Sequence, residues 1–153
     1  MSGPAAAACR QYGLRTLTRS EESVAQRDTQ CFVVDTLGEL LTFYAACDAA
    51  FVAGSFDPIG GHNVLEPAAL GKPVLVGAHT FNFAEVTENL ISDGAASRVQ
   101  NAVELGDTVS RLLADPPARQ RMSANALAAV ERERGAVSRC LEIVASVMQG
   151  RVP

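Results

Sequence analysis

The sequence lacks tryptophan and has few other aromatic residues, which make up only 5% of its 153 residues. It also lacks an excess of basic residues, since 13 lysines and arginines stand against 17 aspartates and glutamates. Nucleic-acid binding usually requires a basic surface that faces the phosphates. The net charge of −4 therefore argues against nucleic acid as a partner.

Cysteine is scarce, and its spacing forms no metal or redox motif. No two of Cys9, Cys31, Cys47 and Cys140 form a C-x-x-C pair, so a zinc or thioredoxin-like site has little support. Cys31 and Cys47 lie in apolar runs, and we expect both to be small buried side chains. A reducing, cytoplasmic compartment is the expected location.

Long apolar runs are missing as well. No segment approaches the roughly 18 apolar residues that a membrane-spanning helix needs. Residues 1–9 are rich in alanine but have no basic stretch, and their apolar part is too short for a signal peptide. The sequence thus predicts neither a membrane span nor export, and we expect the chain alone to be soluble.

Short apolar runs alternate with helical patterns along the chain, which has a length that suits one domain. Such alternation is typical of a parallel sheet covered by helices on both faces. We predict a Rossmann-like α/β domain with about four or five strands against roughly six in a complete one, so the first strand or strands are expected to be missing. Strands are predicted at 13–18, 31–34, 49–53, 73–76 and 95–99, and helices at 36–47, 64–70, 85–92, 102–114, 118–134 and 136–149.

Residues 54–67 carry the most informative pattern. They leave the carboxyl end of a predicted strand and enter a helix, which is where open α/β sheets bind ligands. Gly60 and Gly61 allow a sharp turn and close approach to a ligand. The helix start offers N–H groups to an anion such as phosphate. A tight turn without a ligand is the alternative.

Three polar residues of this segment have both a structural and a ligand-binding interpretation. Asn63 and Glu66 have the spacing of a helix capping box. Glu66 could instead accept two hydrogen bonds from a ribose diol. His62 is either a surface histidine or a donor to a phosphate or carboxylate. The residues alone leave these alternatives open.

A second loop, at residues 77–83, also follows a predicted strand and precedes a helix. His79 and Asn82 stand beside Phe81 and Phe83, which suggests a binding loop. The alternative is that both phenylalanines fill the core and Asn82 caps the next helix.

The two loops together resemble the family of bacterial Kdo (3-deoxy-D-manno-octulosonic acid) transferases. The similarity runs from about Leu14 to about Val144. Asp57, Val64 and Ala78 depart from the family pattern, but none of them removes a polar group. The positions that match, in order and without gaps, are Gly54, Ser55, Pro58, Gly60, Gly61, His62, Asn63, Leu65, Glu66, Pro67, Ala68, Gly71, Lys72, Pro73, Val74, Leu75, Gly77, His79, Phe81, Asn82 and Phe83.

The resemblance implies the C-terminal half of a GT-B glycosyltransferase, which binds the donor CMP-Kdo for an inverting transfer to a lipid A precursor in lipopolysaccharide biosynthesis. It implies no cofactor and no metal. The glycines with His62 and Asn63 would hold the phosphate and the Kdo carboxylate, and Glu66 the ribose. The implied donor-binding residues are Ser55, Gly60, Gly61, His62, Asn63, Glu66, His79 and Asn82.

The resemblance also implies parts that this chain lacks. The family's N-terminal domain carries the catalytic carboxylate, the acceptor groove and the attachment to the cytoplasmic side of the inner membrane. The first strand of the C-terminal domain, with its His-Pro-x-Arg-like motif, is expected to be missing too. Residues 1–153 are thus expected to be one partial donor-binding domain with no catalytic residue. Glu85 and Glu88 fit a solvated helix face better than a catalytic role.

Two other interpretations remain. The chain could belong to another GT-B sugar transferase or an epimerase, although the Gly-Gly-His-Asn sequence at 60–63 speaks against it. It could also be a non-catalytic nucleotide-binding module or an inactive fragment.

The purified chain is expected to transfer no Kdo from CMP-Kdo to a lipid A precursor. General base catalysis needs a side chain near the acceptor hydroxyl, and this sequence offers none. Chromatography of the acceptor after incubation checks this. A glycosylated product would contradict the prediction.

Overall fold

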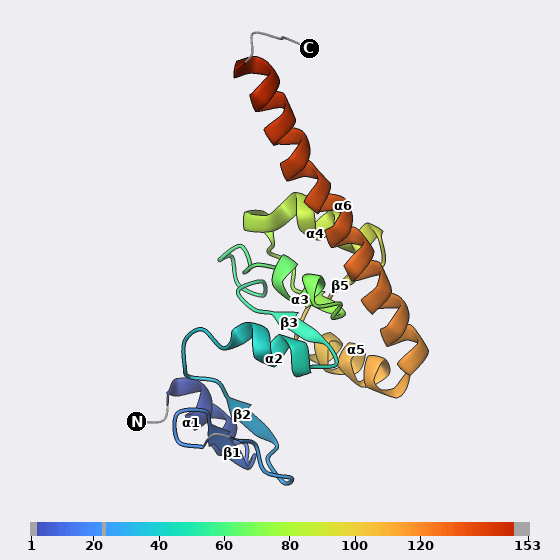
Figure 1. The fold of residues 1–153 in the computed structure, drawn as a ribbon. Helices are drawn as coiled ribbons and strands as arrows, with labels where there is room; N and C mark the ends of the chain where they lie inside the picture. Colours follow the sequence, from blue (N-terminus) through green and yellow to red (C-terminus); the bar gives the residue numbers. More distant parts are fainter. Residues whose placement is uncertain (1–2, 23, 149–153) are drawn as a thin grey trace. The chain divides into compact units, whose positions relative to one another are not determined.

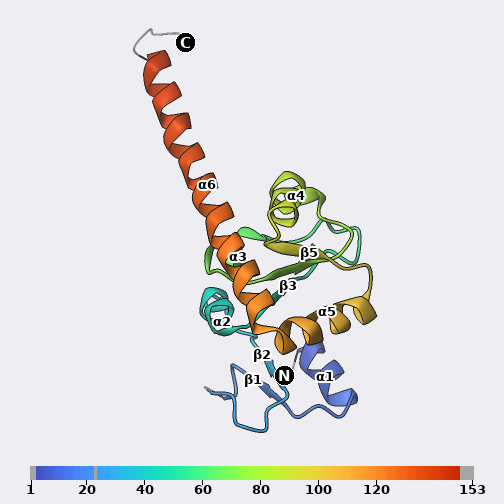
Figure 2. The ribbon, with the colours of Figure 1, turned by 90° about the vertical axis from the view of Figure 1, so that its right-hand side faces the viewer.

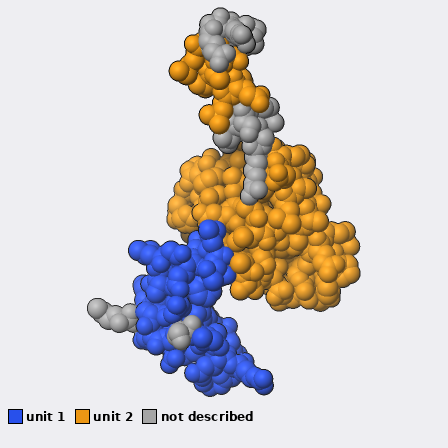
Figure 3. All heavy atoms as spheres, viewed as in Figure 1, with its two compact units in different colours: residues 1–43 blue, residues 44–153 orange. Residues whose placement is uncertain are grey.

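The computed structural model describes residues 3–22 and 24–148, without the side chains of 133–140, so Cys140 lies outside the described side chains. The chain divides into two compact units, residues 1–43 and 44–153 (Figure 3). Within the described ranges, no helix is both long and apolar enough to cross a membrane.

The first unit is a small helix-and-sheet structure (Figure 1). Helix α1 (Pro4–Gln11) packs against two parallel strands, β1 (Thr16–Thr18) and β2 (Cys31–Val33). The sequence pattern did not predict α1. Pro4 at its first turn and the alanine run after it explain the helix, because proline suits that position and alanine has the highest helix propensity.

The cysteines differ from the expectation of full burial. Cys31 and Cys47 are both only half-buried. The Sγ atoms of Cys31 and Cys9 lie 3.1 Å apart as free thiols. The hydrogen bond with Cys9 and, to a smaller extent, burial raise the pKa of Cys31, so the Cys31 thiol stays protonated at neutral pH.

The second unit is built on a three-stranded parallel sheet in the order β3-β4-β5. Each strand is followed by a helix, the arrangement of repeated βαβ units (Figure 1). Short α2 (Leu40–Ala46) leads into the sheet. The further elements are β3 (Ala50–Val52), α3 (Leu65–Ala69), β4 (Val74–Val76), η1 (Phe81–Phe83), α4 (Ala84–Ser92), β5 (Ala96–Arg98), α5 (Ala102–Ala114) and α6 (Pro116–Met148).

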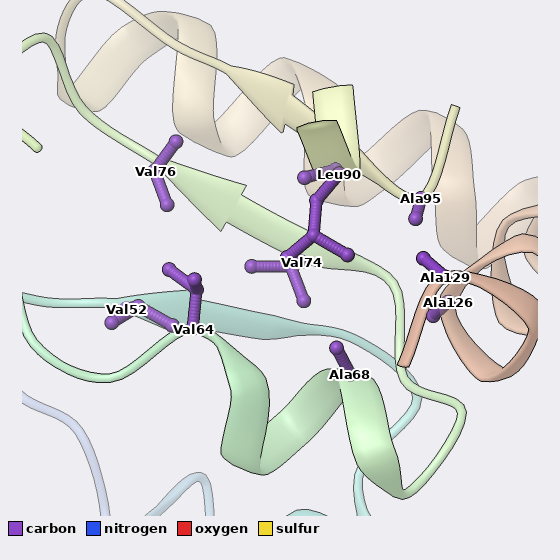
Figure 4. Close-up of a cluster of buried hydrophobic side chains, with 10 residues drawn as sticks. Val52, Val64, Ala68, Val74, Val76, Leu90, Ala95, Ala126 and Ala129 are labelled. Atoms are coloured by element: carbon purple, nitrogen blue, oxygen red, sulfur yellow. The ribbon is translucent and has the colours of Figure 1, made fainter. Parts of the chain in front are cut away.

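One face of this sheet forms the main core (Figure 4). Strand alternation places Val74 and Val76 on that face. Helices α3 and α4 and the first half of α6 supply the facing side chains, among them Leu90 and the fully buried Ala126. Small alanines let α6 approach α3, against which it runs (Figure 2). On the opposite face of the sheet, Leu75 is also fully buried.

The predicted α/β class with parallel strands and flanking helices is confirmed, with three corrections of detail. Hydrogen bonds divide the strands into a two-stranded and a three-stranded sheet, because apolar runs mark strands but not their partners. The helix expected from residue 36 begins only at Leu40, since Gly38 has a left-handed φ of 83°. One helix, α6, replaces the expected pair, because Gly135 costs about 1 kcal/mol in a helix without forbidding it.

Replacing Leu90 by alanine is expected to lower the free energy of unfolding by about 2–5 kcal/mol, because Leu90 is 2% exposed in the core of the second unit. Urea unfolding followed by circular dichroism measures the change. The matched control is Leu113→Ala in α5, where the side chain is 51% exposed and the cost should stay within about 0.5 kcal/mol. Equal losses in the two variants would contradict this core.

Candidate functional site

Two loops leave the carboxyl ends of neighbouring parallel strands. The first, here called the glycine turn, comprises residues 54–63 after β3, and the second loop comprises residues 77–83 after β4. Carboxyl ends of parallel strands are the usual ligand edge of an open α/β sheet. The two segments selected from the sequence therefore lie at one edge of one sheet.

Backbone hydrogen bonds join the two loops directly. The N–H of His79 donates to the carbonyl of Ser55 at 2.9 Å, and the N–H of Asn82 donates to the carbonyl of Gly60 at 3.1 Å. The side-chain amide of Asn82 adds bonds to the carbonyls of Ile59 at 3.1 Å and Gly61 at 3.3 Å. Asn82 therefore holds the glycine turn, and the alternative of a cap for α4 is not formed, because that cap position is Phe83.

The loops approach each other too closely for side chains at two glycines. A Cβ on Gly60 would lie 2.5 Å from Cε2 of Phe81 and 2.6 Å from Nδ2 of Asn82, and Gly60 has a φ of 100°. A Cβ on Gly77 would lie 2.3 Å from the carbonyl oxygen of Ser55. Close contact, and not only a tight turn, thus requires glycine at both positions.

Ser55 is a bridge between the loops. Its side chain is fully buried, and its hydroxyl donates to the carbonyl of Val52 at 2.7 Å while it accepts from the N–H of Gly77 at 2.8 Å. The hydroxyl therefore has no exposed surface to offer a ligand in this structure. Ser55, one of the predicted donor-binding residues, thus joins the two loops.

Asn63 and Glu66 form a polar pair at the start of α3. Oδ1 of Asn63 accepts from the N–H of Leu65 at 3.0 Å, and Nδ2 of Asn63 donates to Oε1 of Glu66 at 3.2 Å. In a capping box the glutamate would instead accept from the backbone N–H of Asn63. Glu66 is half-buried. The burial of Tyr44 and, to a smaller extent, the negative charge of Glu66 raise the pKa of Tyr44. The sequence pattern gave no reason to select Tyr44.

The two histidines lie at the surface of the same edge. His62 is exposed, and its ring covers Gly54, where an added Cβ would come within 3.2 Å of Nε2. His79 is half-buried. The two phenylalanines separate, because Phe83 packs against the core while Phe81 is 61% exposed.

The resulting edge brings together side chains that can donate or accept hydrogen bonds. Imidazole rings and backbone N–H groups of the glycine turn suit an anion, and the Glu66 carboxylate suits a pair of hydroxyl groups. Sequence analysis missed Arg98, whose guanidinium reaches the second loop from β5. No local sequence pattern indicates this contact, because it joins residues about twenty positions apart.

Comparison with known proteins gives consistent similarities. The family model described as glycosyl transferases group 1 matches residues 15–128. A 3-deoxy-D-manno-octulosonic acid transferase of Bordetella pertussis is 46% identical over 108 residues, which are 71% of this chain and 25% of that protein. One from Haemophilus influenzae is 34% identical over 137 residues, or 89% of this chain and 32% of that protein.

A solved structure is similar as well. The C-terminal CMP-Kdo binding domain of WaaA from Acinetobacter baumannii matches with a TM-score of 0.76 and 35% identity, over 80% of this chain and 64% of that one. The chain thus spans about a quarter to a third of the length of the two curated relatives.

Gly60→Ala is expected to destabilise the chain by about 1–3 kcal/mol, because the new methyl group meets Phe81 and Asn82 and φ is left-handed. Gly106→Ala in α5 is the matched control. There nothing lies within 4 Å, and alanine should stabilise the helix by up to about 1 kcal/mol. Thermal unfolding compares them, and a Gly60 variant as stable as the wild type would disprove the close contact.

Proposed function

Since the chain belongs to the glycosyl transferases of group 1, we propose that it is the donor-binding part of a Kdo transferase. Its ligand is CMP-Kdo, a cytidine nucleotide linked to a sugar acid. The relatives of Bordetella and Haemophilus carry the name of that enzyme, and the similar domain of WaaA is called CMP-Kdo binding.

The observation that carries this proposal is the polar group at the carboxyl ends of β3 and β4. His62 is exposed beside the paired glycines, and the carboxylate of Glu66, in the first turn of α3, accepts a hydrogen bond from Asn63. A phosphate anion and a ribose diol are two of the polar groups of a nucleoside monophosphate. Each has a partner of matching chemistry here.

In the proposed complex each residue has a separate part. The glycine turn brings the backbone close to the phosphate, and His62 and Asn63 donate to the phosphate and the Kdo carboxylate. Glu66 accepts from the ribose hydroxyls. His79 borders the same edge, while Asn82 and Ser55 fix the loops against each other.

The activity of the whole protein is part of the proposal. We infer a longer enzyme that transfers Kdo to a lipid A precursor at the cytoplasmic side of the inner membrane, with the catalytic carboxylate outside this chain. The present residues then contribute donor affinity and no catalytic group.

The chain is expected to bind CMP, and isothermal titration calorimetry measures the affinity. Glu66→Gln should weaken CMP binding about tenfold or more, because hydrogen bonds to a charged acceptor contribute about 1.5–3 kcal/mol. The control Glu142→Gln changes an exposed acid on α6 and should bind CMP like the wild type.

A second titration isolates the ribose contact. The wild type should bind CMP more tightly than 2′-deoxy-CMP, and this preference should disappear in Glu66→Gln. Absence of CMP binding by the folded wild-type chain would refute the proposed function. A preference for 2′-hydroxyl that survives in Glu66→Gln would refute only the role of Glu66.

A further inference from the structure

The second loop begins where the hydrogen-bonded ladder of the sheet ends. Strand β5 pairs with β4 up to Arg98 opposite Val76, and the N–H of Val99 donates to the carbonyl of Val76 at 2.8 Å. Beyond that point the carbonyls of Gly77 and Ala78 face no further strand residue of β5. Carbonyl groups at such a position need another donor to keep the backbone in one conformation.

The Arg98 side chain supplies that donor. Its Nη1 lies 2.9 Å from the carbonyl oxygen of Gly77, 3.2 Å from that of Ala78 and 3.3 Å from Oγ1 of Thr80. Thr80 is itself buried. One nitrogen therefore contacts two successive backbone carbonyls of the loop and the hydroxyl of Thr80.

The guanidinium is held from the other side by α4. Its Nη2 donates to Oε1 of Glu88, and this ion pair fixes the plane of the group. The Arg98 side chain is 24% exposed, whereas that of Glu88 is 63% exposed. Because the Glu88 carboxylate is mostly exposed, the ion pair contributes little energy, and its effect is on the orientation of the guanidinium.

We propose that Arg98 is a positioning residue for the donor-binding edge. It fixes the second loop, and the second loop fixes the glycine turn through the bonds of His79 to Ser55 and of Asn82 to Gly60. The effect of Arg98 on the ligand is therefore indirect. This inference rests on the proposed function for its consequence in binding, but not for its consequence in loop order.

Arginine is required at this position rather than a cation in general. A planar fork can direct one nitrogen to the loop and the other to Glu88 at once, whereas a lysine ammonium is a single point charge. Arg98→Lys should therefore retain part of the order that Arg98 gives the loop, and Arg98→Met should retain none of it.

Amide hydrogen exchange of the whole chain tests the loop. In Arg98→Met, the amides of residues 77–83 should exchange about tenfold faster or more, because charge-assisted hydrogen bonds are lost. The amides of β4 should keep their rates. The control Arg111→Met removes an arginine whose guanidinium donates to Asp107 and Thr108 of its own helix, and it should leave residues 77–83 unchanged.

Two exchange results would overturn the proposal. One is an unchanged rate at residues 77–83 in folded Arg98→Met. The other is an equal acceleration in β4, which would mean that Arg98 stabilises the unit as a whole and not the loop.

Titration with CMP and with cytidine tests the consequence for binding. Arg98→Met should weaken CMP about tenfold but cytidine much less, because the glycine turn is assigned to the phosphate. Arg98→Lys should lie between. Equal loss for both ligands, or no loss for either, would overturn positioning of the phosphate site. A wild-type chain that binds neither ligand would refute the proposed function, and the exchange rates would still decide the role of Arg98 in the loop.

Discussion

The contact between the glycine turn and the second loop is the constraint on which the candidate site depends. The loops touch backbone to backbone, so glycine is required at Gly60 and Gly77 for lack of space. The buried hydroxyl of Ser55 adds to this contact, because it donates to the carbonyl of Val52 and accepts from the N–H of Gly77. Because these bonds fix one loop relative to the other, the conformation of each loop depends on the other. The positions of the polar side chains at this edge depend on the same contact.

The sheet explains why these loops meet at all. Strands β3 and β4 are neighbours and parallel, so their carboxyl ends open onto the same edge. Helices α3, α4 and α6 bury the valines of one face, and the fully buried Val74 and Val76 anchor the strand from which the second loop departs. A firmly packed strand followed by an open loop is the common way in which a rigid scaffold presents binding residues.

The resemblance to Kdo transferases seen in the loop motifs is confirmed by the curated relatives and by the similar C-terminal domain. That agreement concerns the family and the fold. The part that each side chain takes in donor binding stays a prediction. The structure nevertheless separates two groups among the predicted residues. His62 is exposed, and Asn63, Glu66 and His79 are half-buried at the edge. The side chains of Ser55 and Asn82 instead form hydrogen bonds between the two loops.

The sequence by itself determined the alternation of strands and helices, the class of fold and the two loops that matter, because apolar periodicity and glycine placement are local properties of a chain. It also marked Asn63 and Glu66 as a pair, since their spacing in a helix brings them together. Only the tertiary structure decided that this pair joins side chain to side chain, that Asn82 binds the glycine turn and that Arg98 reaches the second loop. The contacts of Asn82 and Arg98 join residues about twenty positions apart. Their partners are set by which strands pair, a matter of long-range packing that no local pattern records.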